Sequence, residues 1–117
     1  MFDKTWEGAF ELAWILVEAE VHQTALDKGW YSKDKRNGGE LIALIHSELS
    51  EALEAMRQGN PPAEHIEGFS AVEEELADTV IRVMDLAGYQ GYRVGEAIIA
   101  KMEFNRTRPE RHGGKLF

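Results

Sequence analysis

The sequence of 117 residues contains no cysteine, which excludes disulfide bonds, thiolate metal sites and cysteine nucleophiles. Its first residues lack the basic start and long apolar run of a secretory signal peptide. No stretch approaches the roughly 18 uninterrupted apolar residues that a membrane-spanning helix needs. The lack of cysteine suits a reducing compartment. Since a signal peptide and a membrane-spanning run are also lacking, we expect a cytoplasmic protein with no membrane partner.

Basic residues are in the minority, because 13 Lys and Arg stand against 21 Asp and Glu, for a formal net charge of -8. Binding to a DNA or RNA backbone requires a field of positive charge, so a nucleic acid polymer is not an expected partner. A nucleotide is small, arrives with magnesium and needs only a local positive site. The acidic excess therefore excludes polymers more strongly than monomers.

Strand-length runs of alternating polar and apolar residues are also lacking, and no internal repeat is present. Apolar residues instead recur every three or four positions, as on one face of a helix. The pattern predicts four helices and one longer loop: about Lys4 to Lys28, Asn37 to about Gln58, a loop over 59–69, Ser70 to a turn at Gly88–Gly91, and from that turn to Pro109. We expect one all-α domain over residues 1–117, an antiparallel four-helix bundle.

Capping residues precede three of these helices. Asp3 is expected to cap the first helix, Asn37 with Glu40 has capping-box spacing for the second, and Ser70 with Glu73 forms a capping box for the third. The expected buried stripes are Trp6, Phe10, Ala13, Trp14, Val17 and Val21; Leu41, Ile42, Leu44, Ile45, Leu49, Ala52, Leu53 and Met56; Val72, Leu76, Val80, Val83, Met84 and Ala87; and Val94, Ala97, Ile98 and Met102.

Two pairs of acids have a spacing that can build a metal site. Residues three apart on a helix lie side by side, so Glu48 projects with Glu51, and Glu75 with Asp78. If the two helices are neighbours, four carboxylates can converge. Carboxylates near a core must be paired, hydrogen-bonded or metal-bound, and Arg82 is the main basic candidate nearby.

An oxygen-rich cluster without His or Cys selects hard cations, Mg²⁺ first, with Mn²⁺ as a possible substitute. The alternative is a solvated acidic face. That alternative is the expected one for five other acids: Glu54, Glu64, Glu67, Glu73 and Glu74.

The last predicted helix carries Lys101 and Asn105 one turn apart, on the row of Val94 and Ile98. A lysine and an amide on an inward row suit phosphate binding. Further basic residues follow in this acidic chain, and the alternative for them is favourable charge at a helix C-terminus and in a solvated tail. They are Arg106, Arg108, Arg111 and Lys115.

The motifs together resemble those of the all-α nucleoside triphosphate pyrophosphohydrolases, the MazG-like proteins and their relatives. The resemblance covers roughly residues 36–117. It rests on Glu48-x-x-Glu51, then Glu75-x-x-Asp78, then the text Lys101-Met102-Glu103-Phe104-Asn105-Arg106 and His112-Gly113-Gly114-Lys115. One departure is Ser47, where the family often has a second acid before Glu48, and residues 1–35 carry no text that aligns.

The resemblance implies a helical bundle that assembles as a homodimer or a dimer of dimers. It implies cleavage between the α- and β-phosphates, which gives a monophosphate and pyrophosphate. Glu48, Glu51, Glu75 and Asp78 would be the metal ligands, and Lys101 and Asn105 would contact the nucleotide.

Roles within this reaction can be assigned to further residues. Glu51 is our candidate general base, and Lys101, helped by Arg106 or Lys115, would steady charge on the phosphates. A base could stack on Trp30, Tyr31 or Trp14. Plain core packing is the favoured role of Trp14. His46, close to Glu48, either supports the site or simply packs.

Two rival functions remain open. One is a pyrophosphohydrolase acting on another phosphorylated nucleotide, such as a phosphoribosyl-nucleotide. The other is a non-catalytic helical binding or assembly protein whose acids are solvated. A di-iron bundle is disfavoured because none of the four histidines has a Glu three residues before it.

Overall fold

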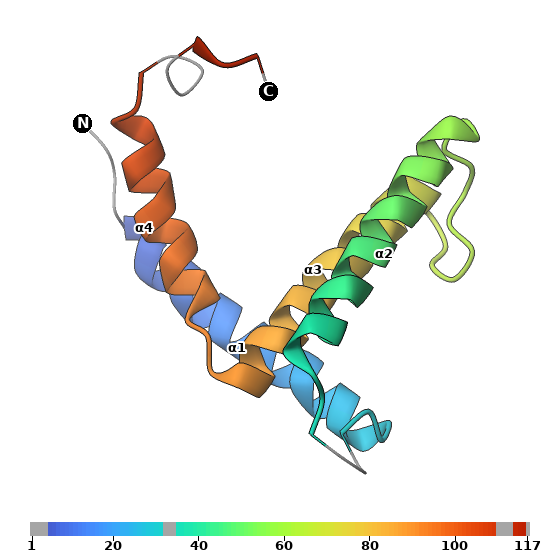
Figure 1. The fold of residues 1–117 in the computed structure, drawn as a ribbon, viewed down its shortest axis with the longest axis horizontal. Coiled ribbons are helices and arrows are strands. Elements are labelled where there is room, and N and C mark those ends of the chain that lie inside the picture. The colour runs from blue at the N-terminus through green and yellow to red at the C-terminus, as the bar shows by residue number, and fades with distance from the viewer. Residues whose placement is uncertain (1–4, 32–34, 110–113, 117) are drawn as a thin grey trace. The chain divides into compact units, whose positions relative to one another are not determined.

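The structure, a computed structural model, describes residues 5–31, 35–109 and 114–116. Over these residues the chain is all-α, as predicted, with no strand (Figure 1). The helices are α1, Thr5–Asp27; α2, Gly38–Arg57; α3, Ala71–Gln90; and α4, Val94–Arg106. Within the part of the chain that is described, none of these helices has both the length and the apolar character that crossing a membrane requires.

The chain divides into two compact units. The central unit comprises Val17–Tyr92, and the terminal unit comprises Met1–Leu16 with Arg93–Phe117. Helix α1 contributes its first turns to the terminal unit and its remaining turns to the central unit.

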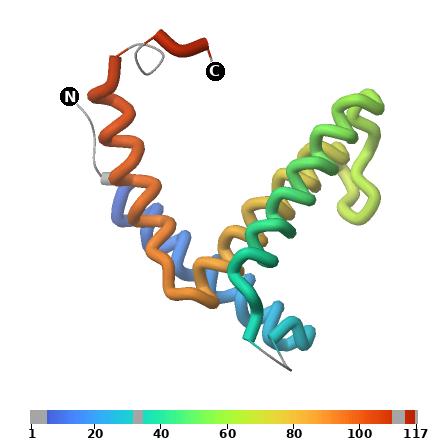
Figure 2. The backbone as a smooth tube through the Cα atoms, viewed as in Figure 1, coloured from blue at the N-terminus to red at the C-terminus, as the bar shows by residue number. Residues whose placement is uncertain are grey.

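Helices α2 and α3 form the main packing of the central unit, running side by side in opposite directions (Figures 1 and 2). Helix α2 begins where Asn37 Oδ1 accepts hydrogen bonds from the backbone N–H groups of Gly39 (2.7 Å) and Glu40 (3.3 Å). Helix α3 begins at a complete capping box between Ser70 and Glu73. The predicted caps at Asn37 and Ser70 are therefore confirmed, whereas Asp3 lies outside the described residues.

The predicted turn at Gly88–Gly91 is wrong, because α3 continues to Gln90. Of the two glycines Gly88 and Gly91, it is Gly91 that adopts a left-handed conformation (φ 74°). Its N–H donates to the carbonyl of Ala87 and ends the helix. Gly88 serves another purpose. A Cβ at this position would lie 3.1 Å from the Cβ of His22, so the glycine lets α1 approach the backbone of α3.

The buried core of the central unit is smaller than the apolar stripes predicted. It consists of Leu41, Ala52, Ala55, Val72, Met84, Leu86 and Ala87. Seven predicted core residues of this unit are instead between 44% and 59% exposed: Val17, Ile42, Leu49, Leu53, Met56, Leu76 and Val80. Each helix of a packed pair is covered by its neighbour on one side only. The predicted apolar stripes are wider than the covered side, so their outer residues stay exposed.

The terminal unit is organised around aromatic side chains of α1. The ring centroids of Trp6 and Phe10 are 6.3 Å apart, and those of Phe10 and Trp14 are 6.0 Å apart. Gly95, buried in α4, lies against Trp14 so closely that a Cβ there would be 2.8 Å from the indole. Other apolar residues of this part of α1, Leu12, Ile15 and Leu16, are exposed.

We expect Gly95→Ala to lower the free energy of unfolding by about 1–3 kcal/mol, because the added methyl group overlaps the Trp14 indole. The matched control is Gly8→Ala, where a Cβ meets nothing within 4 Å and removal of a helical glycine should stabilise by about 0.5–1 kcal/mol. Urea unfolding of both variants measures the difference. Equal effects of the two substitutions would show that the contact between Trp14 and Gly95 is not formed.

Candidate metal centre

Three acids meet where α2 packs on α3. Glu48 and Glu51, one turn apart on α2, and Glu75 on α3 each place a carboxylate oxygen within 4.8 Å of the other two. Glu48 is only 8% exposed, Glu75 is half-buried and Glu51 is exposed. The helical spacing and the packing of the two helices thus produce a cluster of three carboxylates, and Asp78 is not among the three.

The charges in this cluster repel one another. Burial, hydrogen bonds with Glu48 and Glu51, and the negative charges of those two groups raise the pKa of Glu75 to about 8. Such hydrogen bonds require that one carboxyl group holds a proton. When all three are ionised, no donor among the described residues reaches the buried Glu75 Oε2. This open acceptor beside two further carboxylates fits a hard divalent cation, which prefers oxygen ligands.

Asp78 lies one turn beyond Glu75 on α3, at the edge of the cluster. Burial raises the pKa of its carboxyl, as do the charges of Glu48, Glu74 and Glu51, while Arg82 lowers it. Asp78 is therefore close enough to share the field of the cluster.

Arg82 is the basic partner that the sequence suggested. Its Nε donates a hydrogen bond of 2.9 Å to Glu48 Oε1 and forms an ion pair with that carboxylate. Arg82 thereby compensates one of the three negative charges and fixes the orientation of Glu48. Glu51 and Glu75 have no such cationic partner among the described residues.

A pocket of about 260 Å³ adjoins the cluster in the central unit. Glu48, Asp78 and Arg82 line it beside the carboxylates, Trp30 and Arg36 line it from the segment after α1, and apolar side chains of the three helices complete it. Ligand pockets typically occupy about 300–1,000 Å³, so this one suits a small ligand. A ligand placed here would lie directly beside the candidate metal ligands.

The aromatic residues proposed to stack on a base differ in their surroundings. Trp30 is 54% exposed and lines the pocket. Tyr31 is stacked on Tyr89 with 4.5 Å between ring centroids, and its hydroxyl donates to Asp85. Trp14 belongs to the terminal unit, where it packs against Gly95. Among the three, Trp30 has the accessible ring face. His46 is exposed on α2 and is not part of the cluster.

The expectation that Glu74 is solvated is wrong. Its carboxylate is buried and accepts a hydrogen bond from the backbone N–H of Glu64 (3.1 Å), and it lies 3.0 Å from Nδ1 of His65. The loop between α2 and α3 folds back over the first turn of α3, which covers this side chain. Glu74 therefore secures the loop next to the cluster.

The predicted phosphate-binding residues lie in the terminal unit. Lys101 and Asn105 were expected on an inward row, but both side chains are exposed. Nζ of Lys101 lies 4.5 Å from the ring centroid of Phe104, and Arg106 pairs with Glu103. Lys115 is exposed, and Arg111, His112 and Gly113 lie outside the described residues.

Sequence reasoning did not identify Arg36 and Asp85 as pocket residues. Both line the pocket, and Asp85 also accepts the hydroxyl of Tyr31 (2.6 Å) and lies 2.7 Å from Nδ1 of His22. Asp85 continues the row of Asp78 on α3, and this spacing is the only feature of the neighbouring sequence that could have indicated its place in the pocket. Arg36 lies between helices and carries no periodic signal.

Comparisons of the chain with protein-family models, with curated proteins and with solved structures found no match.

We expect the metal-free protein to lose stability as the pH rises from about 4.5 to about 8. The pKa of Glu75 is 4.5 in an ordinary setting and about 8 in the folded protein, so in this window the unfolded chain releases a proton that the folded protein retains. The stabilisation is complete below pH 4.5 and is lost as the pH passes 8. Urea unfolding in chelator across this range measures it.

The comparison that isolates Glu75 is Glu75→Gln, which mimics the protonated group. The free energy of unfolding of the wild type should fall relative to this variant as the pH rises, whereas Glu54→Gln, at an exposed site on α2, should follow the wild type. Parallel curves for wild type and Glu75→Gln would show that Glu75 titrates normally.

Proposed function

We propose that the central unit binds a divalent metal ion, Mg²⁺ first, and that the protein hydrolyses a nucleoside or deoxynucleoside triphosphate to the monophosphate and pyrophosphate. The observation that carries the proposal is the meeting of Glu48, Glu51 and Glu75 within 4.8 Å, with Glu75 Oε2 buried and open to a cation. The resemblance of the motifs to those of MazG-like proteins supports this choice of reaction.

All four acids are metal ligands in the proposal, and Glu51 has a second role. Glu48, Glu75 and Asp78 are ligands, with Glu48 held in place by Arg82. Glu51 is a ligand as well, and as the exposed member of the cluster it is the carboxylate that can take a proton from an attacking water. A bound divalent ion would supply neutralisation of phosphate charge and a water of lowered pKa.

The pocket beside Glu48 and Asp78 provides space for the nucleoside part of the substrate. Trp30 offers an indole face for a base, and apolar side chains such as Leu41 and Ile81 form the remaining wall. On the resemblance, Lys101 and Asn105 contact the nucleotide, and we propose that Arg106 or Lys115 helps Lys101 to steady charge on the phosphates.

Assembly is a further part of the proposal. The exposed apolar residues of α1, α2 and α3 support a homodimer or a dimer of dimers, in which helical hairpins complete an antiparallel bundle. The same exposed surface is the observation that favours the rival function, a non-catalytic assembly protein. A phosphoribosyl-nucleotide is the alternative substrate, because the acids alone do not distinguish it from a triphosphate.

Purified protein with Mg²⁺ and a panel of nucleoside triphosphates and phosphoribosyl-nucleotides should release pyrophosphate. We expect Glu48→Gln, Glu51→Gln, Glu75→Gln and Asp78→Asn each to lower turnover by at least about 100-fold, since each replaces a charged carboxylate ligand with a neutral amide. Glu54→Gln on α2, three residues after Glu51 and solvent-exposed, should retain turnover within about twofold.

Absence of pyrophosphate release from every nucleotide would contradict the proposal. A thermal shift then separates the rivals, because a cluster of like charges that binds Mg²⁺ is stabilised by it, whereas a solvated acidic face is not. Loss of that shift in Glu75→Gln, with the shift retained in Glu54→Gln, would assign the ion to this cluster.

A further inference from the structure

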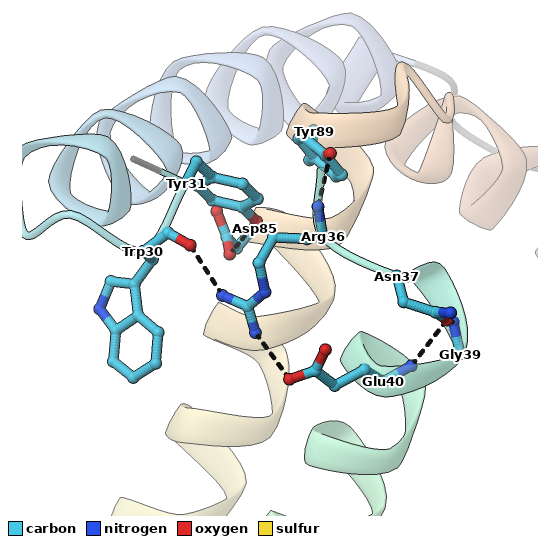
Figure 3. Close-up of polar contacts among 8 residues, drawn as sticks. All are labelled: Trp30, Tyr31, Arg36, Asn37, Gly39, Glu40, Asp85 and Tyr89. Atoms are coloured by element: carbon cyan, nitrogen blue, oxygen red, sulfur yellow. Dashed lines mark hydrogen bonds and ion pairs between the residues drawn. The ribbon is translucent and has the colours of Figure 1, made fainter. Parts of the chain in front are cut away.

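Arg36 has an unusual position for a residue between two helices. Its side chain is only 14% exposed and lies between two aromatic rings, with the guanidinium carbon 5.7 Å from the ring centroid of Trp30 and 5.6 Å from that of Tyr31. Nη1 donates a hydrogen bond of 3.1 Å to the carbonyl oxygen of Trp30 (Figure 3). One guanidinium therefore holds both the backbone and the ring of Trp30.

The position of Arg36 is itself fixed by α2 and α3. Its backbone N–H donates to the hydroxyl of Tyr89 (2.9 Å), and Nη2 lies 3.8 Å from Glu40 Oε1 (Figure 3). The ring of Tyr31 is stacked on Tyr89, and its hydroxyl donates to Asp85. Arg36 thus connects α3, through these contacts, to the segment that carries Trp30.

Arg36 is one of two described residues that hold Trp30 by hydrogen bonds, because the backbone N–H of Trp30 also donates to the carbonyl of Ala25 (3.1 Å). The side chain of Trp30 is largely exposed, it follows the end of α1, and its ring forms part of the pocket that Glu48 and Asp78 also line. The hydrogen bond to Ala25 acts on the backbone, whereas Arg36 also lies against the exposed indole.

We propose that Arg36 is a positioning residue that holds the Trp30 indole as a wall of this pocket and thereby sets the affinity of the pocket for a flat aromatic ring. The ring is a nucleotide base if the proposed function holds, and the inference rests on that function only for the identity of the ligand. A planar guanidinium can lay its flat face on a ring and donate to a carbonyl at once, whereas a lysine ammonium is a compact point charge with no flat face.

The test measures binding without turnover. Isothermal titration with purine and pyrimidine nucleoside monophosphates, in buffer with Mg²⁺, gives the dissociation constant for wild type, Arg36→Met, Trp30→Ala and the double variant. Ribose 5-phosphate, which lacks the base, is the ligand control, and Arg57→Met, at an exposed arginine of α2, is the protein control.

We expect Arg36→Met to weaken binding of the monophosphates by about 5- to 150-fold, the range of aromatic stacking on one base. Binding of ribose 5-phosphate should be unchanged, and Arg57→Met should match the wild type. In the Trp30→Ala background Arg36→Met should have no further effect, because Arg36 acts through Trp30. If Arg36→Met does not fold, Arg36→Lys is measured in the same way and should show a smaller loss of the same kind.

Any one of three results would overturn the inference. The first is equal binding of the monophosphates by wild type and Arg36→Met, and the second is a loss from Arg36→Met in the Trp30→Ala background as large as its loss in the wild type. The third is wild-type binding of the monophosphates that is no tighter than its binding of ribose 5-phosphate. Failure of the proposed function would give a different result. The wild type would then release no pyrophosphate from any nucleotide but would still bind the monophosphates, and this binding would still weaken in Arg36→Met.

Discussion

Repulsion among three carboxylates is built into the contact between α2 and α3, since Glu48, Glu51 and Glu75 come together only because these helices pack. Like charges at such a separation repel, and this repulsion opposes the helix packing that brings them together. Arg82 offsets part of the repulsion at Glu48, and a proton on Glu75 offsets more, as the raised pKa of that group indicates. A cation would replace the proton. The association of the two helices and the chemistry of the site thus share one electrostatic balance.

Local features of the fold could be predicted from the sequence because they depend on neighbours along the chain. The helices follow from apolar periodicity, and the caps at Asn37 and Ser70 follow from side chains that accept N–H groups two or three residues away. Burial was less predictable. Periodicity shows that Leu49 and Met56 share a face with Ala52, but how much of that face a neighbour covers depends on tertiary packing. The role of Gly88 was missed for the same reason, because its close neighbour is on α1.

The candidate site divides in a similar way. The three-residue spacing of Glu48 and Glu51 predicts that they share a face, and an equivalent pair on the next helix suggested where a third ligand would come from. Glu74 was misjudged because the loop that buries it has no periodic signal. Arg36 and Asp85 were missed because their contacts join residues far apart in sequence, such as the hydrogen bond from Tyr31 to Asp85.

Asp85 lies two turns beyond Asp78 on α3 and receives contacts from His22 on α1 and from Tyr31 just after it. The portion of α1 in the central unit is therefore tied to the helix that carries two of the acids, yet it supplies none of them. Substitutions at positions 22 and 31 would remove contacts of Asp85, which lines the pocket, and would change no acid of the cluster. In evolution, the pocket surroundings can therefore change through α1 and the segment after it while the acid cluster on α2 and α3 stays the same.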